Sequence, residues 1–554
     1  MTAVERYDVV IVGGGAAGLT LALQLRRARP DTSVLVLERQ TYPVPETAHK
    51  VGESTVEIAA HYLRDVLGLG DHLESEQLNK FGLRIFFSDE DNRDIARRVE
   101  LGHSVCPPHG VGTYQLDRGR FENALAERLP GQGVDLLASV RVDEIDLRPD
   151  EEFHRVCLAG GREIEARWVV DASGRSALLK RQLGLAKDVA HQANAAWFRI
   201  GHPIDVDDWS ADPAWHERIR EGERRLSTNH LMGAGYWVWL IPLASEATSV
   251  GIVTDPRLHP FDRLNRFDRA LDWLDDHEPQ CADAVRRHRA DLQDFRVMKD
   301  YAYSSEQVFA AERWCLAGEA GVFLDPLYSP GLDLIAISNG LITDLVVHAL
   351  DGEDVDDLAA LHNQVFYLIS DGWFRVYEQQ YPLMDNARVM TAKVIWDTAV
   401  YWAVPGLLYF HDKIPALIDH PRIVADLARF STVSERIQRF FREWHALDTS
   451  RDRDAFIGFY DFDFMPALHL GMTAGLPDHE LEDQFVANVD LVDLISGQLL
   501  AAVIADFEAD AADLDKQDQV RRWRADESLK RLLERAEAEP GAGWLALDRL
   551  AAVR

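Results

Sequence analysis

A cluster of glycines near residue 13 offers the first chemistry in this sequence, the binding of phosphate groups by backbone N–H groups. GGGAAG at 13–18 follows an apolar run at 7–12 and precedes the apolar-periodic segment 19–25. Strand, tight turn and helix in this order let the backbone approach a pyrophosphate, while the helix N-terminus supplies unpaired N–H groups. A second predicted strand, 33–37, ends at Glu38, which is placed to accept a hydrogen bond from a ribose hydroxyl. The pattern predicts a dinucleotide site in a doubly wound, Rossmann-like α/β domain; a glycine-rich turn in an unrelated α/β fold is the alternative.

Two large indoles, Trp237 and Trp239, stand two residues apart in the apolar segment 236–241. Alternation predicts a buried strand with Trp237, Trp239 and Ile241 on one face. Pro242 follows and is expected to end the strand, because proline cannot donate to a ladder. Taken alone, the pair favours side chains that fill a core.

Two later segments favour FAD over a nicotinamide as the dinucleotide. RWVVDASG at 167–174 and RWCLAGEAGVFLD at 313–325 each combine an apolar strand with a turn of small residues, and the second is expected to continue into a helix. A chain that returns three times to one sheet can hold a large cofactor along its length. A plain strand–helix junction is the alternative for each segment.

With these segments in view, the sequence resembles the flavin-dependent halogenases, which are related to the FAD aromatic monooxygenases. The resemblance covers about residues 5–345. The Trp-x-Trp-x-Ile-Pro pattern is its most specific motif. The motifs that carry it are GGGAAG at 13–18, KVGEST at 50–55, NKFGLRIFF at 79–87, YQLDRGRFENAL at 114–125, WVVDASG at 168–174, WVWLIP at 237–242 and GEAGVFLDPLYSPG at 318–331.

The resemblance implies a reaction and a role for each catalytic residue. Reduced FAD, supplied by a separate flavin reductase, would meet oxygen and halide to give hypohalous acid. Lys80 would deliver the halogen to an electron-rich ring, because an ammonium polarises the oxidant and a desolvated lysine can act as nucleophile. Trp237 and Trp239 would form a wall beside the flavin, and Ser329 would bound the halide site. Without the resemblance, Lys80 would be interpreted as a solvated surface lysine.

The resemblance also implies a set of FAD contacts. KVGEST would form a strap over the flavin, with Ser54 or Thr55 as helix caps in the alternative interpretation. Gln115 and Arg118 would contact the flavin or its phosphates, with a salt-bridge cluster at a helix start as the alternative. The implied contacts are Gly13, Gly15, Ala16, Ala17, Gly18, Glu38, Arg39, Val51, Gly52, Glu53, Ser54, Gln115, Arg118, Asp171, Gly174, Gly318, Glu319, Pro326, Gly331 and Leu332.

Three residues depart from the family pattern. Tyr328 precedes Ser329 where tryptophan-type members carry a glutamate, so the phenol- or pyrrole-type members are the better match and a phenolic or otherwise electron-rich ring is the expected substrate, either free or bound to a carrier protein. Pro330 lacks the N–H that a halide site would use, which leaves Gly331 and Leu332 as donors. Glu319 stands where the family usually has aspartate.

Two other functions stay open at this point. An FAD-dependent aromatic monooxygenase, a hydroxylase or epoxidase, shares the fold. Single-component hydroxylases normally carry an adjacent Asp-Gly pair, whereas Ala172 and Ser173 separate Asp171 from Gly174 here. A non-catalytic flavin-binding partner protein is the third hypothesis, and the presence of Lys80 and both indoles speaks against it.

Composition excludes several classes. The net charge of −33 over 554 residues disfavours a nucleic-acid partner, which would need a basic surface. The four cysteines lie far apart without a CxxC pair, so we expect no metal site, no disulfide framework and a cytoplasmic location. We find no signal-like N-terminus and no uninterrupted apolar segment of about 18 residues or more, so no membrane span is expected.

The expected organisation is a GR2-type FAD-binding and halogenase core at 1–345 and a mostly helical C-terminal domain at 346–554. A mixed β-sheet at 186–300 would form the substrate layer, with a helix at 261–273. The acidic DGEDVDD after Leu350 is typical of a boundary. Aromatic residues between 366 and 444 favour a helix core, with a lid over an aromatic or lipid-like substrate as the alternative. The charged segment 506–539 predicts a solvated helix pair.

Overall fold

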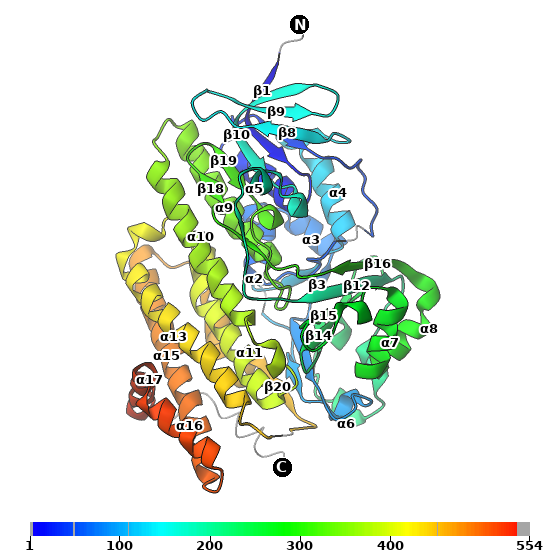
Figure 1. Cartoon of the computed structure of the whole chain (residues 1–554), viewed down its shortest axis with the longest axis vertical. Helices are drawn as coiled ribbons and strands as arrows, with labels where there is room; N and C mark the ends of the chain where they lie inside the picture. Colours follow the sequence, from blue (N-terminus) through cyan, green and yellow to red (C-terminus); the bar gives the residue numbers. More distant parts are fainter. Residues whose placement is uncertain (1–3, 48–49, 109, 451, 540–554) are drawn as a thin grey trace.

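The glycine motif lies at the carboxyl end of β1 (Glu5–Val12), a central strand of the first of two eight-stranded sheets (Figure 1). The computed structural model describes residues 4–47, 50–108, 110–450 and 452–539. β1 pairs in parallel with β2 (Val34–Leu37) and β10 (Glu163–Asp171), and β19 (Trp314–Leu316) lies parallel on the far side of β10. The three segments expected to serve one cofactor are therefore adjacent strands with their carboxyl ends at one edge. The other strands of this sheet are β7 (Val134–Leu137), β8 (Val142–Asp146), β9 (His154–Leu158) and β18 (Phe309–Ala310).

The second sheet contains the indole strand and lies beside the first, below it in the view of Figure 1. β14 (Tyr236–Pro242) runs antiparallel to β13 (Thr228–Gly233) and β15 (Thr248–Thr254), and Pro242 is its last residue, opposite Thr248. Trp237, Trp239 and Ile241 belong to the core that continues into the first sheet. The remaining strands are β4 (Leu83–Phe87), β5 (Glu100–Gly102), β12 (Asn194–Ile200), β16 (Leu292–Met298) and β20 (Phe456–Gly458).

Short helices and strands connect and cover the strands of both sheets. Val238 and Leu240, on the opposite face of β14, belong to a separate apolar core with buried side chains of α7 (Phe267–His277) and α8 (Pro279–Arg287). The helix expected at 261–273 thus begins six residues later, because 261–263 form only a 3-10 turn. The other short elements are α1 (Ala16–Ala28), α2 (Glu57–His61), α3 (Gly70–Glu76), α4 (Arg118–Arg128), α5 (Leu178–Gln182), α6 (Pro213–His216), β3 (Leu78–Lys80), β6 (Thr113–Gln115), β11 (Ala186–Lys187) and β17 (Ser304–Ser305).

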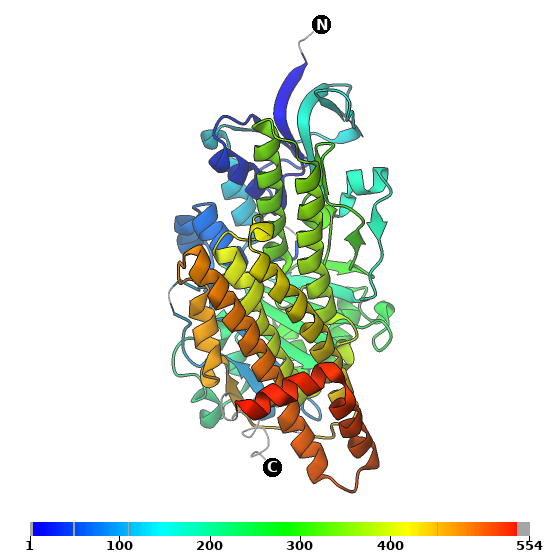
Figure 2. The same ribbon diagram turned by 90° about the vertical axis from the view of Figure 1, so that its left-hand side faces the viewer.

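Long helices from the second half of the chain line one side of both sheets (Figures 1 and 2). α9 (Gly331–Leu350) contacts α1, and the acidic DGEDVDD lies at the turn that joins α9 to α10 (Asp356–Tyr377). α9 therefore runs across residue 345, where the division of the chain is predicted. β20 comes from the helical half and pairs with β5 at the edge of the second sheet. The other helices are α11 (Ala387–Tyr401), α12 (Leu407–Phe410), α13 (Pro421–His445), α14 (Phe464–Gly471), α15 (Asp478–Ala509), α16 (Leu514–Ala525) and α17 (Glu527–Ala538).

The charged C-terminal pair, α16 and α17, is solvated on one side only. Trp523, Leu529 and Leu532 are buried, and α17 packs along α15. Two helices, α9 and α15, meet the length and hydropathy of a membrane span; 67% and 61% of their most apolar windows are buried inside the protein, as in the core helices of soluble proteins.

Candidate active site

A cavity of about 630 Å³ runs from the glycine motif to the indole strand. At its first end the Gly14 N–H donates to the Glu38 carboxylate at 2.6 Å, and the Tyr42 hydroxyl donates to the Gly14 carbonyl. Gly13 has a φ of +119°, and a Cβ at this position would lie 2.2 Å from the Ala172 carbonyl oxygen. Gly18 allows the same turn to close, since its Cβ would lie 2.0 Å from the Gly13 oxygen. The glycines are therefore required by close backbone approach.

Most residues expected to contact the cofactor line this cavity. Those that do are Gly13, Gly15, Ala16, Ala17, Glu38, Arg39, Val51, Gly52, Glu53, Ser54, Arg118, Gly174, Gly318, Glu319, Pro326, Gly331 and Leu332. Trp237, Trp239 and Ser329 line it as well.

Three expected contacts lie behind the wall of the cavity. Gly18 sits under the turn. Gln115 is buried in β6, where its amide donates to the Thr228 hydroxyl at 2.9 Å. Asp171 is buried at the end of β10 and accepts from the Ser173 and Leu179 N–H groups. The side chains of Gln115 and Asp171 are therefore bonded to other groups of the protein and do not line the cavity.

The KVGEST strap is fixed by Arg118 at the start of α4. The guanidinium donates to the carbonyls of Val51 and Gly52 and also pairs with Glu122 at 2.7 Å, so the salt bridge of the alternative interpretation forms, while Arg118 also lines the cavity where the flavin contact is predicted. The capping alternative is wrong, because α2 starts after Val56 without a side-chain cap. The Ser54 hydroxyl instead lies 2.8 Å from the Thr228 hydroxyl.

The paired indoles stand side by side, with ring centroids 5.6 Å apart and planes at 43°. The Trp237 ring N–H donates to the Tyr381 hydroxyl at 3.0 Å, and Tyr381 donates in turn to the buried Asp325 carboxylate at 2.6 Å. The Trp239 ring N–H donates to the Ser249 hydroxyl. Both indoles are thus held in one orientation by hydrogen bonds as well as by packing.

Lys80 lies outside the large cavity and lines a second, smaller one of about 90 Å³. Its ammonium donates to the Ser54 hydroxyl at 2.9 Å and to the Thr55 carbonyl at 2.8 Å. Burial lowers the pKa of Lys80 to about 8, against the opposing effect of the Glu57 and Asp333 carboxylates. Since Ser54 lines the large cavity, one hydrogen bond connects the two spaces.

Helices of the second half supply much of the smaller cavity. Trp373, Tyr377, Tyr401 and Trp402 line it, while most aromatic residues of the same helices are buried in the core. The helix-core interpretation holds for most of these aromatic residues, including Tyr377 and Trp402, and the cover over a substrate stays a prediction. The polar groups in the lining are Glu57, Lys80, His103, Thr113, Asp333, Asp397, Thr398 and His469.

The comparisons with known proteins agree with this architecture. The model of the FAD binding domain family matches residues 6–301, more than half of the chain. The chain belongs to this family. A flavin-dependent halogenase of Dictyostelium discoideum is 23% identical over 455 residues, which span 75% of this chain and 73% of that protein. A 1H-pyrrole-2-carbonyl-[peptidyl-carrier protein] chlorinase of Pseudomonas fluorescens is 28% identical over 375 residues, spanning 64% and 79%.

Solved structures show the same fold. The crystal structure of halogenase PltM superposes with a TM-score of 0.64 at 17% identity, covering 87% of this chain and 96% of that one. Within the FAD-binding family the chain is therefore an enzyme of the flavin-dependent halogenase group, as its motifs predicted.

FAD fits the larger cavity of this flavoenzyme. At one end Gly13, Gly14 and Gly18 leave no room for a Cβ, and Trp197, Trp237 and Trp239 offer flat apolar surfaces at the other. Lys50, Glu122, Trp197 and His230 also line the space, although sequence reasoning did not single them out. Lys50 and Glu122 lie inside the quoted motifs and could have been found there, whereas nothing near Trp197 marks it.

A short segment of the protein, residues 328–333, separates the two cavities. Ser329, Gly331 and Leu332 line the larger cavity, and Tyr328, Pro330 and Asp333 line the smaller one. Tyr328 and Ser329 have φ values of +67° and +62°, in the left-handed backbone region that residues other than glycine rarely adopt. This partition thus presents residues to both cavities.

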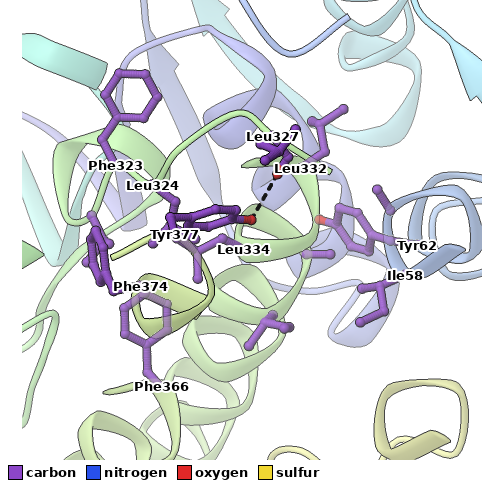
Figure 3. Close-up of a cluster of buried hydrophobic side chains, with 14 of the residues drawn as sticks. Ile58, Tyr62, Phe323, Leu324, Leu327, Leu332, Leu334, Phe366, Phe374 and Tyr377 are labelled. Atoms are coloured by element: carbon purple, nitrogen blue, oxygen red, sulfur yellow. Dashed lines mark hydrogen bonds between the residues drawn. The ribbon is translucent and has the colours of Figure 1, made fainter. Parts of the chain in front are cut away.

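Apolar packing against α10 holds the partition (Figure 3). Leu327, Leu332 and Leu334 lie among buried aromatic rings from α10, and the Tyr377 hydroxyl donates to the Leu327 carbonyl at 2.9 Å. The segment after β19 is thereby fixed without the helix expected there: only a 3-10 turn forms at Gly318–Ala320, and α9 begins at Gly331.

Proposed function

We propose that this flavoenzyme halogenates a single electron-rich, phenolic ring held in the smaller cavity. The observation that carries the proposal is a buried lysine in a ring-sized space, which the 328–333 partition separates from a larger cavity lined by two fixed indoles. When bound and reduced by a partner flavin reductase, FAD supplies the oxygen activation that turns halide into hypohalous acid. Different residues of the protein would then keep the arene away from the flavin, bind halide and deliver the halogen.

Lys80 would hold the hypohalous acid. Two of the three ammonium protons are engaged by Ser54 and Thr55, which leaves one for a ligand in the smaller cavity. A pKa of about 8 keeps the group largely charged near neutrality while making the free amine accessible. Trp237 and Trp239 would keep the arene from reaching the flavin.

The halide would bind at the start of α9, beside Ser329. The N–H groups of Gly331 and Leu332 lie at the N-terminus of a 20-residue helix, where unpaired donors favour anions. Pro330 is the N-cap and contributes no N–H, so this site offers one donor fewer than the family pattern. Chloride and bromide are both candidates.

The lining of the smaller cavity supports a phenolic substrate. Apolar walls from Leu83, Val111, Trp373 and Trp402 surround a few carboxylate and imidazole groups that can accept from a hydroxyl. Halogenase PltM has been crystallised with phloroglucinol and FAD, which supports a hydroxylated ring. The pyrrole halogenases among the relatives act on carrier-bound substrates, so a carrier-tethered ring is the second form to test. We also propose that the protein acts in the cytoplasm.

An FAD-dependent aromatic monooxygenase is the second candidate, and Pro330 is the observation that favours it. If the halide site binds halide too weakly, the enzyme would transfer oxygen to the ring and give a hydroxylated product.

The test supplies protein with FAD, a flavin reductase, NADH and oxygen, and compares chloride, bromide and no added halide over a panel of phenols, free and tethered to a carrier protein. We expect halogenated product by mass spectrometry. In Lys80→Ala this product should fall by at least about 100-fold while FAD stays bound, since Lys80 lies outside the larger cavity. Hydroxylated product that does not depend on halide would move the assignment to monooxygenase.

A further inference from the structure

Beyond Lys80, the smaller cavity contains a carboxylate–imidazole–phenol chain. The Glu57 carboxylate lines the cavity and lies 2.9 Å from Nε2 of His469. Nδ1 of His469 lies 2.5 Å from the Tyr460 hydroxyl, and the imidazole is stacked on Trp402 at 4.0 Å. His469 is buried, whereas Tyr460 is only partly buried. The chain thus begins at the cavity and ends at a partly exposed hydroxyl.

We propose that Glu57 accepts the hydroxyl proton of the aromatic substrate, with His469 and Tyr460 as positioning residues that hold its carboxylate in place and keep it ionised before the substrate binds. The inference rests on the proposed function, because it concerns the ring that Lys80 halogenates. An ionised phenol is a far stronger nucleophile at carbon than the neutral phenol, so removing this proton prepares the ring for attack on halogen.

Geometry favours Glu57 over the other two carboxylates of the cavity. Asp333 already accepts from the Ala59 N–H and the Tyr401 hydroxyl, one on each oxygen. Asp397 already accepts from Lys393, Gln438 and Tyr328. Both aspartates are thus tied to residues of their own surroundings, whereas the described neighbours of Glu57, His469 and Tyr460, form a chain that leads outward.

Electrostatics point the same way. Burial raises the pKa of Asp333 to about 8, so this group is largely protonated at neutral pH and is not a ready proton acceptor; burial also raises the pKa of Asp397. The pKa of Glu57 is lowered, because His469 and Lys80 offset its burial. The other titratable groups around it are His103, whose pKa falls to about 3 through burial and nearby cations, and Tyr401, whose pKa is raised.

The proposed steps balance in atoms and electrons. Glu57 takes the O–H proton of the substrate and leaves a phenolate. A ring carbon attacks the halogen of hypohalous acid; the carbon–halogen bond forms, the halogen–oxygen bond breaks, and the departing hydroxide takes a proton from the Lys80 ammonium to become water. The neutral Lys80 amine then removes the proton from the halogenated carbon, and Glu57 returns its proton to the product. The sum is phenol plus hypohalous acid giving halophenol plus water.

The test compares two phenols that differ in acidity. Phenol, with a pKa of about 10, is neutral at about pH 7.5, whereas 2,6-difluorophenol is substantially ionised there. Glu57→Gln keeps the side-chain volume and loses the ability to take a proton. We expect kcat/KM to fall by about 100-fold for phenol and by less than about 5-fold for difluorophenol.

The controls separate this role from other effects. Loss of the Glu57 charge also lowers the pKa of Lys80, but that effect would slow both phenols by one common factor. Asp333→Asn is the matched carboxylate change and should not discriminate between them. His469→Gln breaks the ion pair with Glu57 and should also lower kcat/KM for phenol more than for difluorophenol, but by a smaller factor. This variant replaces Glu57→Gln as the test if Glu57→Gln does not retain FAD. Equal losses for the two phenols in both variants would overturn the proposal, and absence of halogenated product from the unaltered enzyme would overturn the proposed function with it.

Discussion

At the scale of single residues, the proposed site depends on a buried lysine that still has polar and charged neighbours. Lys80 is 6% exposed, and its ammonium is held by a hydroxyl and a carbonyl while two carboxylates face it. Desolvation disfavours the charged form and the carboxylates favour it, and desolvation has the larger effect. The charge of Lys80 is therefore expected to change as the pH passes through about 8.

That balance predicts a pH dependence. The pKa of Lys80 lies near 8, so the ammonium that would hold hypohalous acid is present below this pH and is lost as pH rises through it. With 2,6-difluorophenol, kcat should fall about tenfold per pH unit above about pH 8 to 9. Lys80→Arg supplies the control, because a guanidinium stays protonated and its residual activity should lack this decline. A decline that persists in the arginine variant would assign the pH dependence to another group.

At the scale of elements, the decisive feature is the junction between the 328–333 partition and α9. Sequence reasoning located this junction from its motif and noted the missing N–H of Pro330, and the structure makes Pro330 the N-cap of the helix. The motif alone could not show that residues of this segment line two different cavities. That arrangement goes with positive φ values at Tyr328 and Ser329 and with packing against α10, which depends on tertiary structure.

Restoring the missing donor should strengthen halide binding. Pro330 has a φ of −76° and ψ of −7°, which alanine adopts without strain, so Pro330→Ala adds one N–H at the helix N-terminus. A hydrogen bond to a charged group contributes about 1.5 kcal/mol or more, so the KM for chloride should fall by about tenfold. Pro421→Ala, at the start of the distant α13, is the control and should leave this KM unchanged. An unchanged chloride KM in Pro330→Ala would remove the start of α9 as the halide site.

At the scale of the whole molecule, both halves of the chain line the smaller cavity, where the reaction is proposed. Sequence patterns predicted the FAD sheet and the helical second half, because strand runs, glycine turns and helix periodicity are local signals. They did not predict that β20 would join the second sheet, nor that His469, about 400 residues after Glu57, would be its partner. Both contacts join segments far apart in the chain, and neither has a sequence signal of its own.

The turn between α9 and α10 offers a test of this mutual dependence. Residues 351–354 are exposed and lie between two long helices, so a protease site inserted there should be cut without disturbing either helix. We expect the two fragments to elute together on size exclusion with FAD bound and with halogenation retained, because β20 pairs with β5 and the walls of the smaller cavity come from both halves. A chain split after residue 345, inside α9, is the matched comparison and should lose FAD and activity. If the fragments cut in the turn separate without denaturant, the second half is a detachable domain and the shared cavity does not hold the halves together.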